Sequence, residues 1–196
     1  HLLEMHMESL MRVLQKRATG KLVLILFVIT TGVYATIVFF TIPVVIDGVP
    51  DLRLFDMSPT GYDLEYTRYL LESLGEVGRN RYISLQLPAD FVYPGLFGLT
   101  YTLLLTWIFK RGFPPQSRVF YLALVPAFAA AFDYAENIGI IMMLRNYPAI
   151  SPGTVEFASA STVLKSLLTV ASYLLFCGGI GVVATKRLLR QRRRKL

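Results

Sequence analysis

Two acids and an amide interrupt an apolar stretch that is long enough to cross a bilayer. Within residues 119–144, Asp133, Glu136 and Asn137 have the spacing i, i+3, i+4, which places them on one face of a helix. An ionised carboxylate is costly in hydrocarbon, so intramembrane acids usually face partners in a helix bundle or a wet cavity. These side chains could take part in carboxylate acid–base chemistry, ligate Mg²⁺ or Ca²⁺ through oxygen, or form ion pairs.

Two other ionisable side chains are predicted at a similar depth. Asp90 lies near the start of one neighbouring apolar stretch and Lys165 near the start of another. At about 1.5 Å of rise per residue, both reach the side of the bilayer that holds the acids of 119–144. The excess of acid over ammonium requires a shared proton, a bound cation or a second base such as Arg79 or Arg81.

The predicted site is a ligand-binding or ion-pair cluster. It consists of Asp90, Asp133, Glu136, Asn137, Lys165, Tyr93 and Arg79. A purely structural ion-pair network and a ligand-binding or catalytic role both remain open, and no catalytic residue, cofactor or metal-ligand set is assigned.

The sequence lacks the residues that several common kinds of catalytic or metal site require. His1 and His6 lie on the opposite side from the acids, which argues against a histidine-ligated zinc site or a Ser-His-acid triad in the cluster. There is no glycine-rich phosphate loop, and the single cysteine, Cys177, excludes an intrachain disulfide and a CxxC motif. Carboxylate chemistry or oxygen ligation of a cation remains.

The composition is that of a polytopic membrane protein. Hydrophobic residues make up 54% of the 196 residues and charged residues 17%. We expect an all-α, antiparallel bundle of four transmembrane helices forming one domain. The predicted spans are 22–46, 88–109, 119–144 and 161–185. A cleaved signal peptide is the alternative for the first, but the apolar run is longer than an h-region.

The connections between the spans differ in character. Residues 1–21 are predicted to form an amphipathic lead-in near the membrane surface, and 186–196 a basic tail attracted to anionic lipid. Residues 47–87 should form a helical cap with an amphipathic helix over 63–74, which Gly75 ends in a left-handed conformation. Turns are also indicated within this segment by Gly48, Pro50, Pro59 and Gly61. Residues 110–118 and 145–160 are predicted to be short connections.

Charge sets the expected orientation. The lead-in, the 110–118 hairpin and the tail hold 14 Lys and Arg against 2 acids, whereas the other two connections hold 5 against 8. The positive-inside rule then predicts a multi-pass protein of the cell (inner) membrane with both termini cytoplasmic and the 47–87 cap extracytoplasmic. Nucleic-acid binding is not expected despite the net charge of +7, because the basic residues gather at the ends of the spans.

A set of short motifs resembles a family of small, uncharacterised four-span bacterial integral membrane proteins. The most specific is the Phe-Asp-x-x-Glu-Asn segment at 132–137. The others are Gly61-Tyr62, Leu74-Gly75, Gly78-Arg79, Tyr82, Gln86-Leu87, Asp90, Tyr93-Pro94 and Ser161-Thr162-Val163-Leu164-Lys165. In that family an aromatic residue tends to follow the lysine, whereas Ser166 does so here. The resemblance covers roughly 47–172 and implies the topology, but no activity.

Two classes of function follow from these residues. The first is a membrane protein whose outer-leaflet carboxylate–lysine pocket binds a lipid head group or a small polar ligand, with catalysis left open. The alternative is an accessory or assembly subunit of a larger membrane complex, in which the polar cluster only holds the helices together. Ion-coupled transport is less favoured because four spans show no repeat. The expected partners are membrane lipids and, for the second class, other protein subunits.

Overall fold

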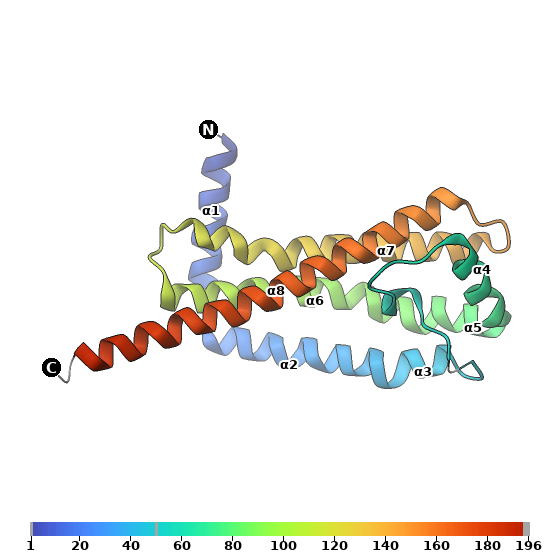
Figure 1. Ribbon diagram of the computed structural model, residues 1–196, viewed down its shortest axis with the longest axis horizontal. Coiled ribbons are helices and arrows are strands. Elements are labelled where there is room, and N and C mark those ends of the chain that lie inside the picture. Colours follow the sequence, from blue (N-terminus) through green and yellow to red (C-terminus); the bar gives the residue numbers. More distant parts are fainter. Residues whose placement is uncertain (1, 50, 194–196) are drawn as a thin grey trace.

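Long apolar runs with few helix breakers produce a mainly helical structure. It describes residues 2–49 and 51–193, and all regular elements in these residues are helices, with no strand among them. It is a computed structural model (Figure 1). The elements are α1 (Leu2–Arg17), α2 (Gly20–Thr36), η1 (Ile37–Thr41), α3 (Ile42–Val45), η2 (Phe55–Met57), α4 (Leu64–Ser73), α5 (Gly75–Arg81), η3 (Tyr82–Gln86), α6 (Leu87–Gly112), η4 (Arg118–Leu124), α7 (Val125–Asn146) and α8 (Pro152–Arg193). Of the sequence predictions, those on His1, Pro50 and residues 194–196 lie outside the described residues.

Four helical segments are long and apolar enough to cross a membrane. They are Gly20–Val45, Gly75–Gly112, Arg118–Asn146 and Pro152–Leu189. The prediction of an all-helical chain with four such helices is therefore confirmed. Two of these helices are longer than the predicted spans. The second begins inside the expected cap 47–87, and the fourth begins inside the expected connection 145–160.

Proline explains two irregular turns within these segments. The π-helical turn Ile37–Thr41 ends two residues before Pro43, and the π-helical turn Tyr82–Gln86 ends two residues before Pro88. A proline has no N–H to donate to the carbonyl four residues earlier, so the helix widens locally to accommodate the missing bond. The two turns touch, and the Thr41 hydroxyl donates to Gln86 Oε1.

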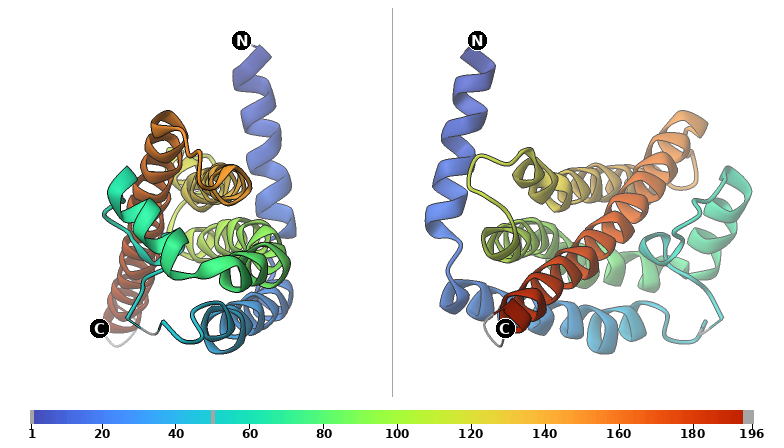
Figure 2. Two further views of the ribbon diagram at one scale, coloured as in Figure 1. Left: turned by 90° about the vertical axis from the view of Figure 1, so that its right-hand side faces the viewer. Right: turned by 60° about the vertical axis from the view of Figure 1, so that its left-hand side comes forward.

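The four long helices pack along the long axis of the molecule (Figure 1). Helix α6 lies against α2, α7 and α8, and α7 packs along α8. Helix α1 leaves this group and points away from it in each view (Figure 2). Lys110 of α6 holds the end of α1 to this group, because its ammonium donates to Gln15 O at 2.6 Å and to Ala18 O at 3.2 Å.

The segment between α3 and α6 folds over the end of the molecule that lies opposite the C-terminus (Figure 1). Asp63 caps α4 by accepting a hydrogen bond from Tyr66 N at 2.8 Å, and Gly75 follows the helix with φ +60°, which confirms the predicted left-handed turn. Leu54 and Phe55 are fully buried and draw the preceding loop inward. The loop is thus packed against the helices rather than solvated.

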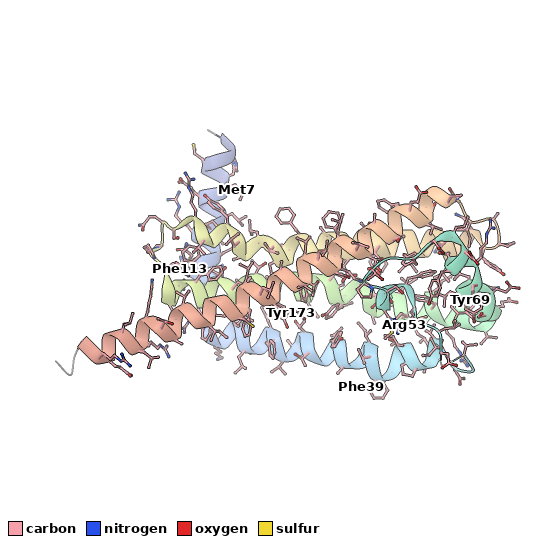
Figure 3. The ribbon with its side chains drawn as sticks, viewed as in Figure 1. Met7, Phe39, Arg53, Tyr69, Phe113 and Tyr173 are labelled. Carbon is pink, nitrogen blue, oxygen red and sulfur yellow. The ribbon has the colours of Figure 1, made fainter. Side chains whose placement is uncertain are left out.

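Large apolar side chains cover the outside of the long helices. Phe39 on η1 is 71% exposed and points away from the protein, and Leu174 on α8 is 67% exposed (Figure 3). Exposed apolar surface of this extent is unfavourable in water and is expected where lipid tails are the solvent.

Candidate functional site

The centre of the polar cluster is an ion-pair triad between α7 and α8. Lys165 Nζ lies 3.1 Å from Asp133 Oδ1 and also contacts Glu136 Oε2. Thr162, one turn before the lysine, donates to Glu136 Oε1 at 2.6 Å. Because Glu136 is completely buried, the ammonium and this hydroxyl replace the water that its carboxylate would otherwise bind.

Asp90 lies beside the triad but is held by different partners. Its carboxylate accepts a hydrogen bond from Gln86 Nε2 at 2.7 Å, and among the described residues no ion pair joins it to Lys165. Its main-chain carbonyl accepts from Asn137 Nδ2 at 2.8 Å. That carbonyl would normally accept from residue 94, which is proline, so Asn137 supplies the missing donor.

An acid that sequence reasoning missed joins the cluster from the loop before α4. Asp56 Oδ2 accepts a hydrogen bond from the Tyr82 hydroxyl at 3.2 Å, while its Oδ1 is buried without a hydrogen-bond partner. The neighbouring Phe55 packs on Tyr62 with ring centroids 4.6 Å apart and so fixes the loop. The apolar Leu54-Phe55 pair in a polar loop was the available sequence signal.

Burial raises the pKa of Asp56 from 3.8 to about 7. The negative charges of Glu136 and Asp133 act in the same direction, whereas the positive charge of Lys165 and the hydrogen bond from Tyr82 oppose them. A carboxyl with a pKa raised in this direction is of the type that can serve as acid or base.

A cavity of about 610 Å³ connects these groups with an apolar wall. Gln86, Asp56, Asp90, Asp133 and Lys165 lie at its polar end. The remaining wall comes from α2, η1, α3, α6, α7 and α8 and from η2 with Pro59 after it. It is lined by aromatic, aliphatic and hydroxyl side chains, among them Tyr34, Ile37, Val38, Phe97, Tyr101, Ala129, Ser166, Thr169, Val170 and Tyr173. Helices α2 and α8 both line the cavity yet have no extensive contact with each other.

The two remaining predicted site residues lie in different places. Tyr93 lines the cavity, with its ring centroid 5.5 Å from that of Tyr34. Arg79 is not in the cavity wall, because its guanidinium donates to Leu71 O at 2.6 Å and lies 4.2 Å from the centroid of the Tyr147 ring. Arg79 thus connects α4, α5 and the loop after α7.

Comparison of the chain with models of known protein families, with curated protein sequences and with solved structures gave no match. The function must therefore be inferred from the geometry of the site. The cavity combines four carboxyl side chains with one ammonium group, if Glu136 behind the wall is included. Within 2–49 and 51–193, no three His, Cys, Asp or Glu side chains are arranged to ligate a metal ion together.

The raised pKa of Asp56 predicts a pH-dependent stability. The folded protein binds the proton of Asp56 more tightly than the unfolded chain does. The contribution of protonated Asp56 to the free energy of unfolding is therefore fully present below about pH 3.8 and is lost as the pH rises through about 7. Thermal unfolding of the purified protein in detergent should show this decline, and Asp56→Asn should flatten it. Asp51→Asn, which changes an exposed acid of the same loop, should retain the wild-type pH dependence. Equal slopes for Asp56→Asn and wild type would contradict the assignment.

Proposed function

We propose that this multi-pass membrane protein binds an amphiphilic small molecule, such as a lipid, in the cavity between α2, α6 and α8. The polar end of the ligand lies against Lys165 and the carboxylates, and its apolar part lies along the aromatic wall. The observation on which this proposal rests is that one cavity is lined both by charged side chains, Asp56, Asp90, Asp133 and Lys165, and by a larger set of aromatic, aliphatic and hydroxyl side chains. Ligand sites usually combine such an apolar lining with a few fixed polar groups.

We infer the orientation from charge. Residues 1–21, 110–118 and 186–196 carry 14 of the 20 Lys and Arg, and the segment 47–87 carries seven of the 13 Asp and Glu. By the positive-inside rule, the termini face the cytoplasm of a cell with an inner membrane, and α4 and α5 form an extracytoplasmic cap over an antiparallel four-helix bundle. The polar end of the cavity then lies in the outer leaflet, where the head group of a lipid would reach it.

The charge of the cavity favours a cationic head group. Lys165 is shared between Asp133 and Glu136, which leaves one carboxylate charge of this triad uncompensated, and among the described residues no ion pair joins Asp56 or Asp90 to a cation. A bound ammonium group would neutralise this excess charge, and the tyrosine rings of the wall would accept it through their faces. An anionic head group would add repulsion in a site of low dielectric constant.

The proposal is tested by filling the cavity from its wall. Thr169→Trp places an indole in the cavity, whereas Leu167→Trp adds the same side chain to a position on α8 that is 62% exposed and outside the cavity wall. Both variants are titrated with fluorescent probes that share one alkyl chain and carry an ammonium, a neutral or a carboxylate head. Wild type and Leu167→Trp should bind the ammonium probe best, and Thr169→Trp should bind it at least about tenfold more weakly, a loss of about 1.4 kcal/mol.

Native mass spectrometry of the same detergent-purified proteins tests for a ligand that is retained from the cell. A mass found on wild type and Leu167→Trp but absent from Thr169→Trp supports the proposal. Equal retention and equal probe affinity in both tryptophan variants, at the same thermal midpoint, would contradict it. Asp133→Asn shows in addition whether the acid holds the retained molecule.

One observation favours the second candidate, an accessory subunit with a structural ion-pair network. Glu136 is fully buried and is held from α8 by both Lys165 and Thr162, which is the arrangement of a group that fixes two helices. This candidate predicts that other protein subunits co-purify with the chain. It also predicts that Thr169→Trp leaves both their retention and probe binding unchanged.

A further inference from the structure

A second recess lies at the other end of the molecule, between the last turns of α6 and the C-terminal part of α8. We call it the α6–α8 groove. It has a volume of about 220 Å³ and is lined by Trp107, Ile108 and Arg111 of α6 and by Ile180, Val183, Ala184 and Arg187 of α8. The two helices meet beside it, where a Cβ atom on Gly112 would lie 3.3 Å from Val183 Cγ2.

Two arginines bring positive charge to this groove without a compensating acid. Within 2–49 and 51–193, no carboxylate forms an ion pair with either Arg111 or Arg187. Arg111 is held in place, because its guanidinium lies 3.5 Å from the centroid of the Trp107 ring and donates to Trp107 O at 2.7 Å. One guanidinium is thus oriented in advance, and a second lines the same small recess.

The neighbouring lysines differ from these arginines. Lys110 donates to the carbonyls of Gln15 and Ala18, and Lys186 donates to Gly112 O. Their ammonium groups therefore satisfy the ends of helices, whereas the groove contains the guanidinium groups of Arg111 and Arg187. The planar fork of a guanidinium matches a phosphate better than an ammonium does.

The remaining wall of the groove is apolar. Ile108, Ile180 and Val183 line it, and the indole of Trp107 is of the type that lies at the membrane interface. An anion that is only a phosphate would leave these side chains uncovered. A phosphate that carries acyl chains would cover them while it meets both arginines.

We propose that the α6–α8 groove binds an anionic phospholipid, with its phosphate between Arg111 and Arg187 and an acyl chain along Ile108 and Ile180. Basic recesses between transmembrane helices are known to accept such head groups. The site is separate from the cavity at the other end of the molecule. This proposal therefore does not depend on what that cavity binds.

The test measures lipid retention by native mass spectrometry after reconstitution with equal amounts of phosphatidylglycerol and phosphatidylcholine of identical acyl chains. Wild type should retain phosphatidylglycerol preferentially, with one molecule bound more tightly than the rest. Arg111→Gln and Arg187→Gln should each weaken that molecule by about tenfold, because each removes a charge-assisted contact to phosphate. The matched control is Arg118→Gln, which removes an exposed arginine of η4 at the same end of the molecule but outside the groove.

Three outcomes would overturn the proposal. Equal retention by the Arg111→Gln/Arg187→Gln double variant and wild type would show that the groove is not the site. An equal loss in Arg118→Gln would show diffuse attraction to the basic end instead. Displacement of phosphatidylglycerol by inorganic phosphate would show that the anion alone is recognised. Thermal midpoints of all variants in the same detergent identify any loss that arises from unfolding.

Discussion

Lys165→Met should lower the free energy of unfolding by about 3–5 kcal/mol, the range observed when one partner of a buried ion pair is removed. Methionine fills a similar volume, so the loss arises mainly from charge. Glu136, which is completely buried, would keep only the hydroxyl of Thr162 as a partner, and Asp133 would lose its ammonium contact. Reversible unfolding in mixed micelles of detergent and sodium dodecyl sulfate measures the change.

A double variant separates charge from packing in this experiment. Lys165→Met with Glu136→Gln leaves no uncompensated charge at the fully buried position, so it should recover much of the lost stability. Lys21→Met is the matched control, because Lys21 is exposed at the start of α2. A Lys165→Met protein that is as stable as Lys21→Met would show that the triad contributes little to the fold.

The members of the triad could be predicted because residue type and spacing within single apolar runs are enough to identify them. The cost of placing a carboxylate in hydrocarbon identifies Asp133 and Glu136, and the helical period puts them on one face. The same cost of placing a charge in hydrocarbon identifies Lys165 in the next apolar run. The structure brings these three side chains into contact, and Thr162 meets the same carboxylate because it lies one turn before the lysine. The presence of four long apolar helices follows equally from composition, but the extension of the second and fourth beyond their apolar runs does not.

The position of Asp56 could not be predicted in the same way. An acid in a loop is ordinarily solvated, and only the burial of Leu54 and Phe55 against the long helices brings Asp56 to the cavity. That burial depends on the shape of a surface formed by several helices. The sequence pattern of the loop alone does not reveal this shape. Arg79 is the opposite case, a predicted site residue that lies outside the cavity wall. The path of the cap places its guanidinium against the Leu71 carbonyl and the Tyr147 ring instead.

The sequence contains enough information to predict the partner of Asn137, a residue that we place in the ligand-binding or ion-pair cluster. Pro94 follows Asp90 by four residues, so a helix through both must leave the carbonyl of Asp90 without its usual donor. A buried amide on a neighbouring helix is a suitable replacement, and Asn137 donates to this oxygen. Its role is therefore to hold α6 against α7, and the charged groups around it define the polar end of the cavity.

Gly139→Ala should destabilise the protein by about 1–3 kcal/mol, although alanine is the better helix former. Gly139 lies on α7 one turn after the triad acids, where the helix approaches α8 closely. A Cβ atom at this position would lie 2.6 Å from Ala158 Cβ and 3.2 Å from Ala158 Cα. The second of these atoms belongs to the backbone, so the contact can be relieved only by moving the two helices apart.

The same movement would stretch the bonds from α8 to Glu136, which links packing at Gly139 to the geometry of the site. Gly178→Ala is the matched control, because a Cβ atom on that α8 glycine meets nothing within 4 Å. It should leave stability unchanged or raise it by up to about 1 kcal/mol, as expected for a glycine replaced within a helix. Unfolding in mixed micelles should therefore give opposite signs for the two substitutions. Equal effects would mean that α7 and α8 are not in close contact at Gly139, and the position of Lys165 beside the two acids of α7 would then lose its structural basis.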